Sequence, residues 1–280
     1  MGINMKISFT TLATPELTGV EAIRLAGKFG YGGVDLRVSK NKGEVTLDSG
    51  TSEINEIKAA LKSEGIELSS LLCYNHIGAL SPQALISAVD DIRRNLELAD
   101  RMGAVSIRVF SGKKEKDVSY DAYFNYMLEI FAKASEDVPE NRTMLLQNHF
   151  GEMNAAACAK IVQAVNRPCF KLFFSTEHCL VMGESYDEVL KEIDGTIGHV
   201  FLADIILQEQ GYRDVYPGKG EVPLKHIFNF LREKEFNGWI SFKWERIWHP
   251  ELAGYDEALP AFLAYMKEMQ RQHASVVAAD

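Results

Sequence analysis

The sequence predicts a single (β/α)8 barrel, an α/β protein with a closed parallel sheet. Three observations lead to this prediction. Short runs of β-type residues alternate with helical patterns along the whole chain, the connections are short, and neither a linker nor a compositional break divides the 280 residues. Alternation of this kind indicates a parallel sheet, and eight units in about 250 residues fit a closed barrel better than an open doubly wound sheet.

Eight strands are expected where short apolar runs lie between turn residues. Their ranges are 6–10, 32–38, 66–72, 104–110, 143–149, 170–175, 198–204 and 239–245. Eight helical segments are expected after them, at 19–30, 52–65, 81–103, about 119–136, about 153–165, about 185–194, 223–235 and about 256–271. Gly65 ends the second helix as a C-terminal glycine, and Ser81 with Pro82 suits the start of the third. We expect one domain over 1–280, with a frayed tail at about 272–280.

The composition excludes several classes of partner. With 46% hydrophobic and 25% charged residues, the chain is typical of a globular protein. A formal net charge of −9 disfavours nucleic acid, because phosphate backbones are bound mainly through clustered Lys and Arg. The stretch MGINMKISFTTLA has no apolar run long enough for a signal peptide, so we expect none there, and no apolar run reaches the ~18 residues of a membrane span. We therefore expect a cytoplasmic protein that contacts neither nucleic acid nor membrane.

The four cysteines are expected to be small core residues. Cys73, Cys158, Cys169 and Cys179 lie in apolar segments and show no C-x-x-C spacing. This pattern is typical of buried thiols rather than of disulfide bridges or zinc ligands.

The main alternative fold is an open α/β sheet with a dinucleotide site, but no G-x-G-x-x-G follows the first strand. The only comparable glycine pair lies in PGKGEVP (217–223). Its first interpretation is a turn that ends a loop. In the second interpretation, the amides of Gly218 to Gly220 and the side chain of Lys219 bind a phosphate near a helix start.

Polar residues are dense where the predicted strands end, and in a barrel the active site lies at these C-terminal ends. They are Asp35, Arg37, Asn75, His76, Arg108, Gln147, His149, Ser175, Glu177, His178, His199, Asp204, Lys243 and Glu245. Buried polar groups are costly unless they are partnered, so this density indicates a functional pocket. Some of these residues also have a purely structural interpretation. Asp35 with Arg37, or Arg108 with a nearby carboxylate, would form an ion pair inside the barrel, and His199 would be a buried core histidine.

The stretch ISFKWERIWHPEL (240–252) contains the least expected of these residues. Side chains alternate across a strand, so Lys243 and Glu245 share one face while Phe242 and Trp244 share the other. A lysine near the end of a buried strand needs an explanation, because burial disfavours its charge. Trp248, just beyond, is either a platform for a sugar or a packing residue against the final helix.

The order of elements and four segments resemble the xylose isomerase-like TIM barrel superfamily of sugar phosphate isomerases and epimerases. The segments are GYGGVDLRV, GAVSIRVFSG, LLQNHF and PGKGEVPLKHIFNFLREKEFNGWISFKWERIWHPEL. The resemblance covers nearly the whole chain. It implies a divalent metal such as Mn, Mg or Zn, bound by a Glu ending strand five, an Asp ending strand six, a His on strand seven and a Glu on strand eight. That metal polarises the sugar carbonyl and hydroxyl while carboxylates move the proton.

This sequence departs from the family pattern at every ligand position. The four positions hold Gln147, Ser175, Phe201 and Lys243, and the neighbours that remain are His149, His178, Asp204 and Glu245. Hard divalent cations need anionic oxygen or neutral imidazole ligands. We therefore expect no metal and no other cofactor, with Lys243 placing a positive charge near the vacated position.

Two classes of function remain open, and in both the partner is a sugar or sugar phosphate. In the first, the protein is a metal-independent isomerase or epimerase. Lys243 then acts as electrophile for an enediolate oxygen or, with a pKa lowered by burial, as a base or imine-forming amine, and His178, His149 or Glu245 moves protons. In the second, a catalytically silent homologue keeps the pocket for sugar binding or regulation. The expected substrate-binding residues are Gln147, Arg108, Asp204, Ser175, His76, Trp248 and Lys219.

Three further possibilities concern a displaced metal site, assembly and nucleic acid. A metal held in a new way by His149, His178 and Glu245 stays open, as does assembly into a homo-oligomer. A nucleic-acid repair enzyme of the related endonuclease type is disfavoured, because it needs a metal cluster and a basic face and the sequence has neither signal.

Overall fold

Eight parallel strands close into a barrel in the order β1-β10-β7-β6-β5-β4-β3-β2, as the sequence predicts. The computed structural model describes residues 5–40, 43–75, 77 and 79–277, and side chains up to residue 271. The barrel strands are β1 (Lys6–Thr10), β2 (Gly33–Val38), β3 (Glu67–Cys73), β4 (Ser106–Val109), β5 (Thr143–Gln147), β6 (Phe170–Ser175), β7 (Ile197–Leu202) and β10 (Trp239–Phe242). Pairing of β1 with both β2 and β10 closes the sheet.

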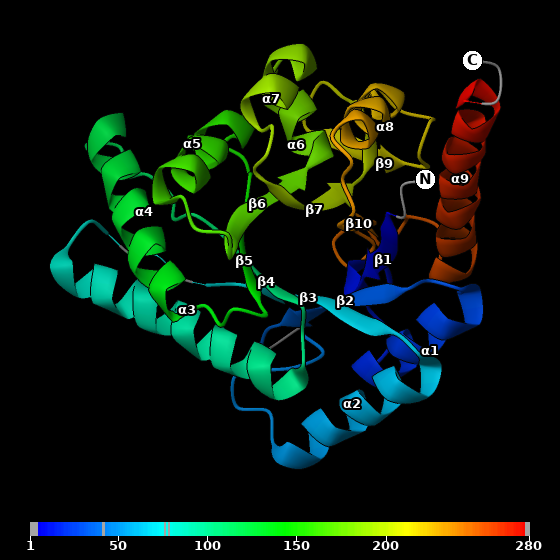
Figure 1. The fold of residues 1–280 in the computed structure, drawn as a ribbon, viewed down its shortest axis with the longest axis horizontal. Helices are drawn as coiled ribbons and strands as arrows, with labels where there is room; N and C mark the ends of the chain where they lie inside the picture. The colour runs from blue at the N-terminus through cyan, green and yellow to red at the C-terminus, as the bar shows by residue number, and fades with distance from the viewer. Residues whose placement is uncertain (1–4, 41–42, 76, 78, 278–280) are drawn as a thin grey trace.

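Helices cover the outside of the barrel and form a ring around the strands (Figure 1). They are α1 (Gly19–Phe29), α2 (Thr51–Glu64), α3 (Pro82–Met102), α4 (Tyr120–Ala134), α5 (Ala155–Val165), α6 (Thr176–Val181), α7 (Tyr186–Glu192), α8 (Leu224–Glu233) and α9 (Tyr255–Val277), with 3-10 turns η1 (Thr11–Ala13) and η2 (Ser135–Asp137). Ser81 caps α3 and Pro82 opens it, as expected, and Gly65 ends α2 with φ of 66°. In the described part of the chain, no helix is long and apolar enough to cross a membrane.

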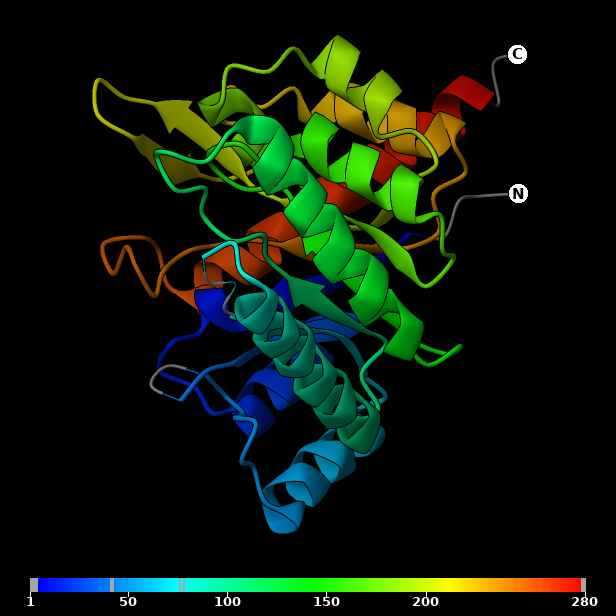
Figure 2. The same ribbon diagram turned by 90° about the vertical axis from the view of Figure 1, so that its left-hand side faces the viewer.

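The structure corrects the sequence prediction after the seventh barrel strand. The expected strand 198–204 ends at Leu202, and Asp204 instead begins an antiparallel hairpin of β8 (Asp204–Leu207) and β9 (Tyr212–Val215). Gly211, with φ of 77°, adopts the left-handed conformation in the connection between these two strands. The hairpin and the loop after β10 project from the same side of the barrel, on the left of Figure 2.

Four further differences from expectation concern β5, β10, α6 and α9. The strand predicted to run to residue 149 ends at Gln147, and the one predicted to run to residue 245 ends at Phe242, so the polar residues beyond them lie in loops. Helix α6 follows β6 without a loop, where none was predicted. Helix α9 continues to Val277 instead of ending near residue 271.

The barrel interior contains an apolar layer and a polar layer. Leu72, Leu145, Phe173 and Phe201 form a cluster of their own, separate from the larger core between sheet and helices. As predicted, the cysteines are free: Cys73, Cys158 and Cys179 are buried and Cys169 is partly buried.

Candidate functional site

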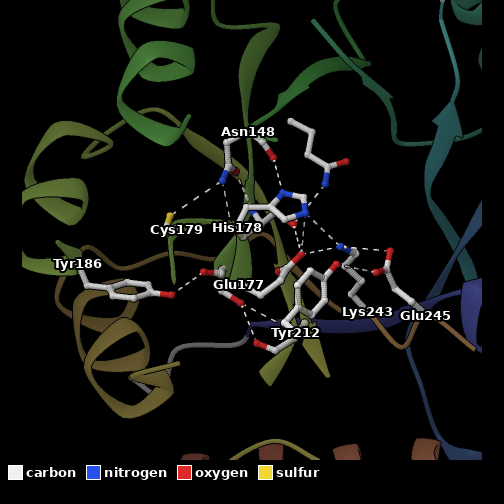
Figure 3. A network of polar contacts seen from close by, with 12 residues as sticks. Asn148, Glu177, His178, Cys179, Tyr186, Tyr212, Lys243 and Glu245 are labelled. Atoms are coloured by element: carbon white, nitrogen blue, oxygen red, sulfur yellow. Dashed lines mark hydrogen bonds and ion pairs between the residues drawn. The ribbon is translucent and has the colours of Figure 1, made fainter. Parts of the chain in front are cut away.

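Lys243, the first residue after β10, lies buried between two carboxylates at the mouth of the barrel (Figure 3). Its Nζ is 2.5 Å from Oε1 of Glu177, at the start of α6, and 3.3 Å from Oε1 of Glu245. A third acceptor, Nε2 of His178, is 3.4 Å away. An ammonium group has three protons, so this side chain has one acceptor available for each of them.

The two carboxylates also determine the charge of Lys243. Burial alone would lower its pKa, but the negative charges of Glu177 and Glu245 outweigh burial and raise the pKa above its ordinary value. The amine is therefore protonated at neutral pH. Of the two roles predicted for Lys243, this favours a fixed cation over a base or an imine-forming amine.

His178 is a neutral imidazole with a defined tautomer. Its Nδ1 lies 2.9 Å from the carbonyl oxygen of Asn148, which can only accept, so Nδ1 carries the proton and Nε2 faces Lys243. Burial and the nearby Lys243 charge lower the pKa of His178 to about 3. The backbone amide of Ser175 also donates a hydrogen bond to Oδ1 of Asn148, at 2.7 Å, and this bond joins the loop after β5 to the end of β6.

Gln147 and Ser175 extend the polar network from β5 and β6. Gln147 donates to Ser175 Oγ (3.2 Å), and Ser175 donates to Glu177 Oε1 (2.9 Å), the same oxygen that Lys243 binds. Two acceptors in this hydrogen-bond network, Gln147 Oε1 and Glu177 Oε2, are buried and have no hydrogen-bond partner among the described residues. Buried acceptors of this kind are costly to leave unpaired, so this part of the site has unused capacity for hydroxyl donors.

The hairpin adds two residues that the sequence analysis did not select. Tyr212 donates its hydroxyl to Glu245 Oε2 at 3.2 Å, and Asp214, two residues further along β9, is on the same face of the strand. Burial and the charge of Glu245 raise the pKa of Asp214 to about 7. Its Oδ2 is buried and has no hydrogen-bond partner in the described structure. The site thus contains one carboxyl group that titrates near neutral pH.

A row of rings links the opposite wall of the mouth to His178. Ring centroids are 6.2 Å apart for Tyr74 and Phe110, 5.1 Å for Phe110 and His149, and 4.6 Å for His149 and His178. Burial, His178 and Lys243 lower the pKa of His149 to about 3, so it too is neutral. The guanidinium of Arg108, on β4, lies 3.9 Å from the Phe110 ring centroid.

The barrel interior below the site has its own polar layer. Asp35 accepts hydrogen bonds from Ser69 and Ser241, each at 2.5 Å, and His199 Nε2 is 2.7 Å from the Ser241 hydroxyl. His199 is therefore a partnered core histidine, as interpreted from the sequence. The predicted alternative of an Asp35 ion pair with Arg37 is wrong, because Arg37 pairs with Glu44.

Asp204 and the glycine loop have a role different from the predicted one. Oδ2 of Asp204 accepts from the amides of Gly218 and Gly220, both at 2.8 Å, and Oδ1 accepts from the amide of Val222 at 3.2 Å. The amides considered for phosphate are thus engaged by a carboxylate of the chain itself. Asp204 thus anchors this loop, and Lys219 is exposed on it.

Two remaining candidates lie at or beyond the edge of the site. Trp248 is about half exposed, and its backbone amide donates to the Glu245 carbonyl at 2.9 Å in the turn that follows the site. His76 lies outside the described residues.

The side chains that the resemblance assigns to the family's metal-ligand positions, at Gln147, Ser175, Phe201 and Lys243, make other contacts in the structure. Phe201 packs edge-on against Phe173, with ring centroids 4.3 Å apart, and Lys243 Nζ lies between His178 and Glu245. Among residues 5–40, 43–75, 77 and 79–277, no group of three or more His, Cys, Asp or Glu side chains is arranged to hold a metal ion.

Three site residues that the sequence prediction missed have identifiable signals. Tyr212 and Asp214 belong to YRDVY, an alternating run that follows the apolar run DIIL across a glycine turn, which is a hairpin pattern. Asn148 lies between two residues that were selected. No sequence signal indicates that its carbonyl would orient His178, because that contact depends on the loop conformation after β5.

Comparisons with known proteins agree with this architecture. A family model described as Xylose isomerase-like TIM barrel matches residues 23–265. A search of curated proteins by sequence finds no match.

Similar solved structures include three named enzymes. The probable 3-DHS dehydratase AsbF of Bacillus anthracis has a TM-score of 0.74 at 17% identity, covering 94% of this chain and 99% of that chain. D-psicose 3-epimerase of Clostridium cellulolyticum H10 has a TM-score of 0.70 at 16% identity, covering 85% and 84%. The 3-keto-D-glucoside 4-epimerase YcjR of E. coli has a TM-score of 0.70 at 15% identity, covering 96% and 100%. At these identities the likeness shows the fold alone.

Proposed function

Because the chain belongs to the xylose isomerase-like TIM barrel family, we propose that it acts on a sugar-like molecule at the barrel mouth as a metal-independent isomerase or epimerase. The observation that carries this proposal is the Lys243 ammonium, held between Glu177 and Glu245 beside two neutral histidines. The names of two similar structures, both sugar epimerases, support the class of substrate.

The donor set does not fit the divalent metal that the family implies. An amide, a hydroxyl, a phenyl ring and an ammonium stand at Gln147, Ser175, Phe201 and Lys243, and hard cations require anionic oxygen or neutral imidazole. A site built instead from His149, His178 and Glu245 is also disfavoured, since the Lys243 cation lies within 3.4 Å of His178 and 3.3 Å of Glu245. The proposed chemistry therefore uses only side chains of this protein.

In the proposed reaction, a carboxylate removes the proton from the carbon next to the substrate carbonyl. The electron pair of that C–H bond forms the C=C bond of an enediolate, and the negative charge moves to the former carbonyl oxygen, where the Lys243 ammonium stabilises it. Glu245 is the proposed base, because its side chain is the more exposed of the two that flank Lys243. Return of a proton to the same carbon from the opposite face re-forms the carbonyl and gives an epimer. Return of a proton to the former carbonyl carbon gives an isomer, and in that case the hydroxyl proton of the first carbon moves to the former carbonyl oxygen, so that the new carbonyl forms at the first carbon.

Asp214 is the proposed proton donor for the return step. It is the carboxyl group at the mouth whose pKa is raised to about 7, so both protonation states are populated at neutral pH. Tyr212, on the same strand face, bonds Glu245 and links the hairpin to the base.

The alternative function is sugar binding without catalysis. The saturation of Lys243 by three protein acceptors favours this alternative, because a substrate oxygen must displace one of them to reach the ammonium. The two proposals share the same pocket and differ in whether a C–H bond is broken.

Deuterium exchange separates the two proposals. Aldoses and ketoses would be incubated with the protein in D2O, with and without EDTA, and NMR would follow exchange at the carbon next to the carbonyl. We expect exchange that EDTA leaves unchanged and that is lost in Lys243→Met/Glu177→Gln, a pair that removes the cation and its buried counter-charge together. Lys160→Met, at an exposed lysine of α5, is the matched control and should keep full exchange.

Three results would count against metal-independent catalysis. Loss of exchange with EDTA and recovery with manganese or zinc would assign the chemistry to a metal. Exchange that persists in the double variant would remove Lys243 from the reaction. Sugar-induced stabilisation with no exchange would favour the binding protein.

A further inference from the structure

Arg108 is a buried cation without an anionic partner. The residue is 3% exposed, and no carboxylate in the described part of the chain lies within ion-pair distance of its guanidinium. Its Nε is buried and has no hydrogen-bond partner among the described residues. By contrast, the other buried cations, Arg37 and Lys243, each pair with a carboxylate. A buried charge is expensive unless it is paired, so Arg108 needs an explanation.

The aromatic rings around Arg108 compensate only part of this cost. Its guanidinium carbon lies 3.9 Å from the centroid of Phe110 and 5.0 Å from that of Tyr74. Such rings attract a cation through their faces, and the Tyr74 hydroxyl also accepts a hydrogen bond from the guanidinium, but the in-plane N–H groups include Nε–H, which has no partner among the described residues. Those N–H groups form the fork that binds carboxylate or phosphate.

Asp35 does not fill this role. Both of its oxygens accept short hydrogen bonds from serines, Ser69 and Ser241. Burial raises its pKa to about 7, so at neutral pH it carries only part of a negative charge. Its attraction to Arg108 acts through space, without a direct contact.

The position of Arg108 places it opposite the reactive group. In the barrel order, β4 and β10 are four strands apart among eight, so Arg108 and Lys243 belong to opposite walls of the mouth. Contacts through Phe110, His149 and His178 connect the two cations along one side. A ligand that reaches Lys243 can therefore place its other end at Arg108.

We propose that Arg108 binds an oxyanion of the ligand, a carboxylate or a phosphate, so that the protein takes an acidic sugar derivative rather than a neutral sugar. This inference rests on the proposed sugar site and names its substrate class. The ligand lies across the mouth, with its anionic group against β4 and its hydroxyl or carbonyl end against Lys243.

Paired probes test the charge separately from the skeleton. D-gluconate would be compared with D-glucitol, D-glucuronate with D-glucose, and D-glucose 6-phosphate with D-glucose, at constant ionic strength in chloride. Glycolate and inorganic phosphate would test the anion subsite alone. Affinity would be measured by calorimetry and by the shift in thermal midpoint, on the wild type, Arg108→Met and Arg108→Lys. Arg94→Met, at an exposed arginine, is the matched control.

We expect at least one acid to bind the wild type about 10- to 100-fold more tightly than its neutral counterpart, the range of a charge-assisted pair. That preference should vanish in Arg108→Met, persist in part in Arg108→Lys and remain whole in Arg94→Met. The carboxylate and phosphate series then identify which oxyanion binds.

Two results overturn the inference: acids that bind no more tightly than their neutral counterparts, or an acid preference that survives Arg108→Met. Its failure is distinguishable from failure of the proposed function. Deuterium exchange on a neutral sugar with no acid preference removes only the anion site. An Arg108-dependent acid preference without any exchange removes only the catalysis.

Discussion

Replacing Lys243 with methionine tests the electrostatic arrangement of the site directly. At an effective dielectric constant of about 20, the 2.5 Å and 3.3 Å distances correspond to gross attractions of about 7 kcal/mol with Glu177 and about 5 kcal/mol with Glu245. Desolvation of the ammonium offsets much of this sum. Removing one partner of a buried pair generally costs about 3–5 kcal/mol, because the remaining charge is left uncompensated.

The expected loss is large enough to measure by thermal or urea unfolding. At about 2–4 °C per kcal/mol for a chain approaching this size, the Lys243→Met variant should melt about 10 °C below the wild type. Glu177→Gln in the same chain should restore most of the loss, because it neutralises the buried carboxylate that lost its partner. Lys160→Met removes an exposed pair with Glu192 and should change the midpoint little.

The rescue is the decisive part of the experiment. If Lys243→Met has the same thermal midpoint as the wild type, the ammonium is not held by these carboxylates. If the variant is destabilised but Glu177→Gln gives no recovery, the loss comes from packing rather than from uncompensated charge. Either result would refute the described arrangement of the cation.

Two further predictions concern the supports of the site. Burial raises the pKa of Asp35 from 3.8 to about 7, so the folded state binds this proton more tightly than the unfolded state and the free energy of unfolding falls as the pH rises from about 4 to about 7. The variant Asp35→Asn should remove up to about 4 kcal/mol of this pH dependence, measured by urea unfolding at several pH values. An unchanged pH profile in the variant would contradict the prediction. The variant Gly220→Ala places a methyl group against the Asp204 carboxylate and the Ile205 carbonyl. Hydrogen exchange at the amides of Gly218 and Val222, which bond Asp204, should therefore accelerate. Unchanged protection of these amides would show that Asp204 does not anchor the loop.

The sequence predicted the barrel because its local signals agree with one another. Alternating apolar runs, helix caps at Ser81 and Gly65, and short connections each indicate the same architecture, and all eight barrel strands lie within the expected ranges to within a few residues. The errors occur where tertiary contacts decide. In the run VFLADIIL, Asp204 is the single polar residue among apolar ones, and the local pattern does not show whether it ends the barrel strand or, as the structure has it, begins a hairpin two residues after the strand ends at Leu202.

The candidate site was predictable in its position and less so in its contacts. The strand-end rule found Lys243, His178, Gln147 and Ser175, and the structure brings these four together. It also selected Asp204, which instead binds backbone amides, because spacing along a strand does not reveal which acceptors a loop needs. The same rule missed Asp214, because it considers only residues at the ends of barrel strands and Asp214 reaches the mouth from a hairpin outside the barrel.

The two buried cations of the mouth differ in a way that assigns them different tasks. Lys243 already has an acceptor for each of its three protons, so a full negative charge on a ligand would compete with Glu177 and Glu245 for it. Arg108 has no carboxylate partner in the described structure, and its buried Nε–H has no hydrogen-bond partner among the described residues. A permanent anionic group should therefore bind at Arg108. Negative charge that develops only during the reaction is stabilised at Lys243, because a substrate oxygen must displace one of the protein acceptors there, and only the full charge of the transition state compensates for that lost hydrogen bond. On this argument, variants of Arg108 should raise KM with little change in kcat, and variants of Lys243 should lower kcat.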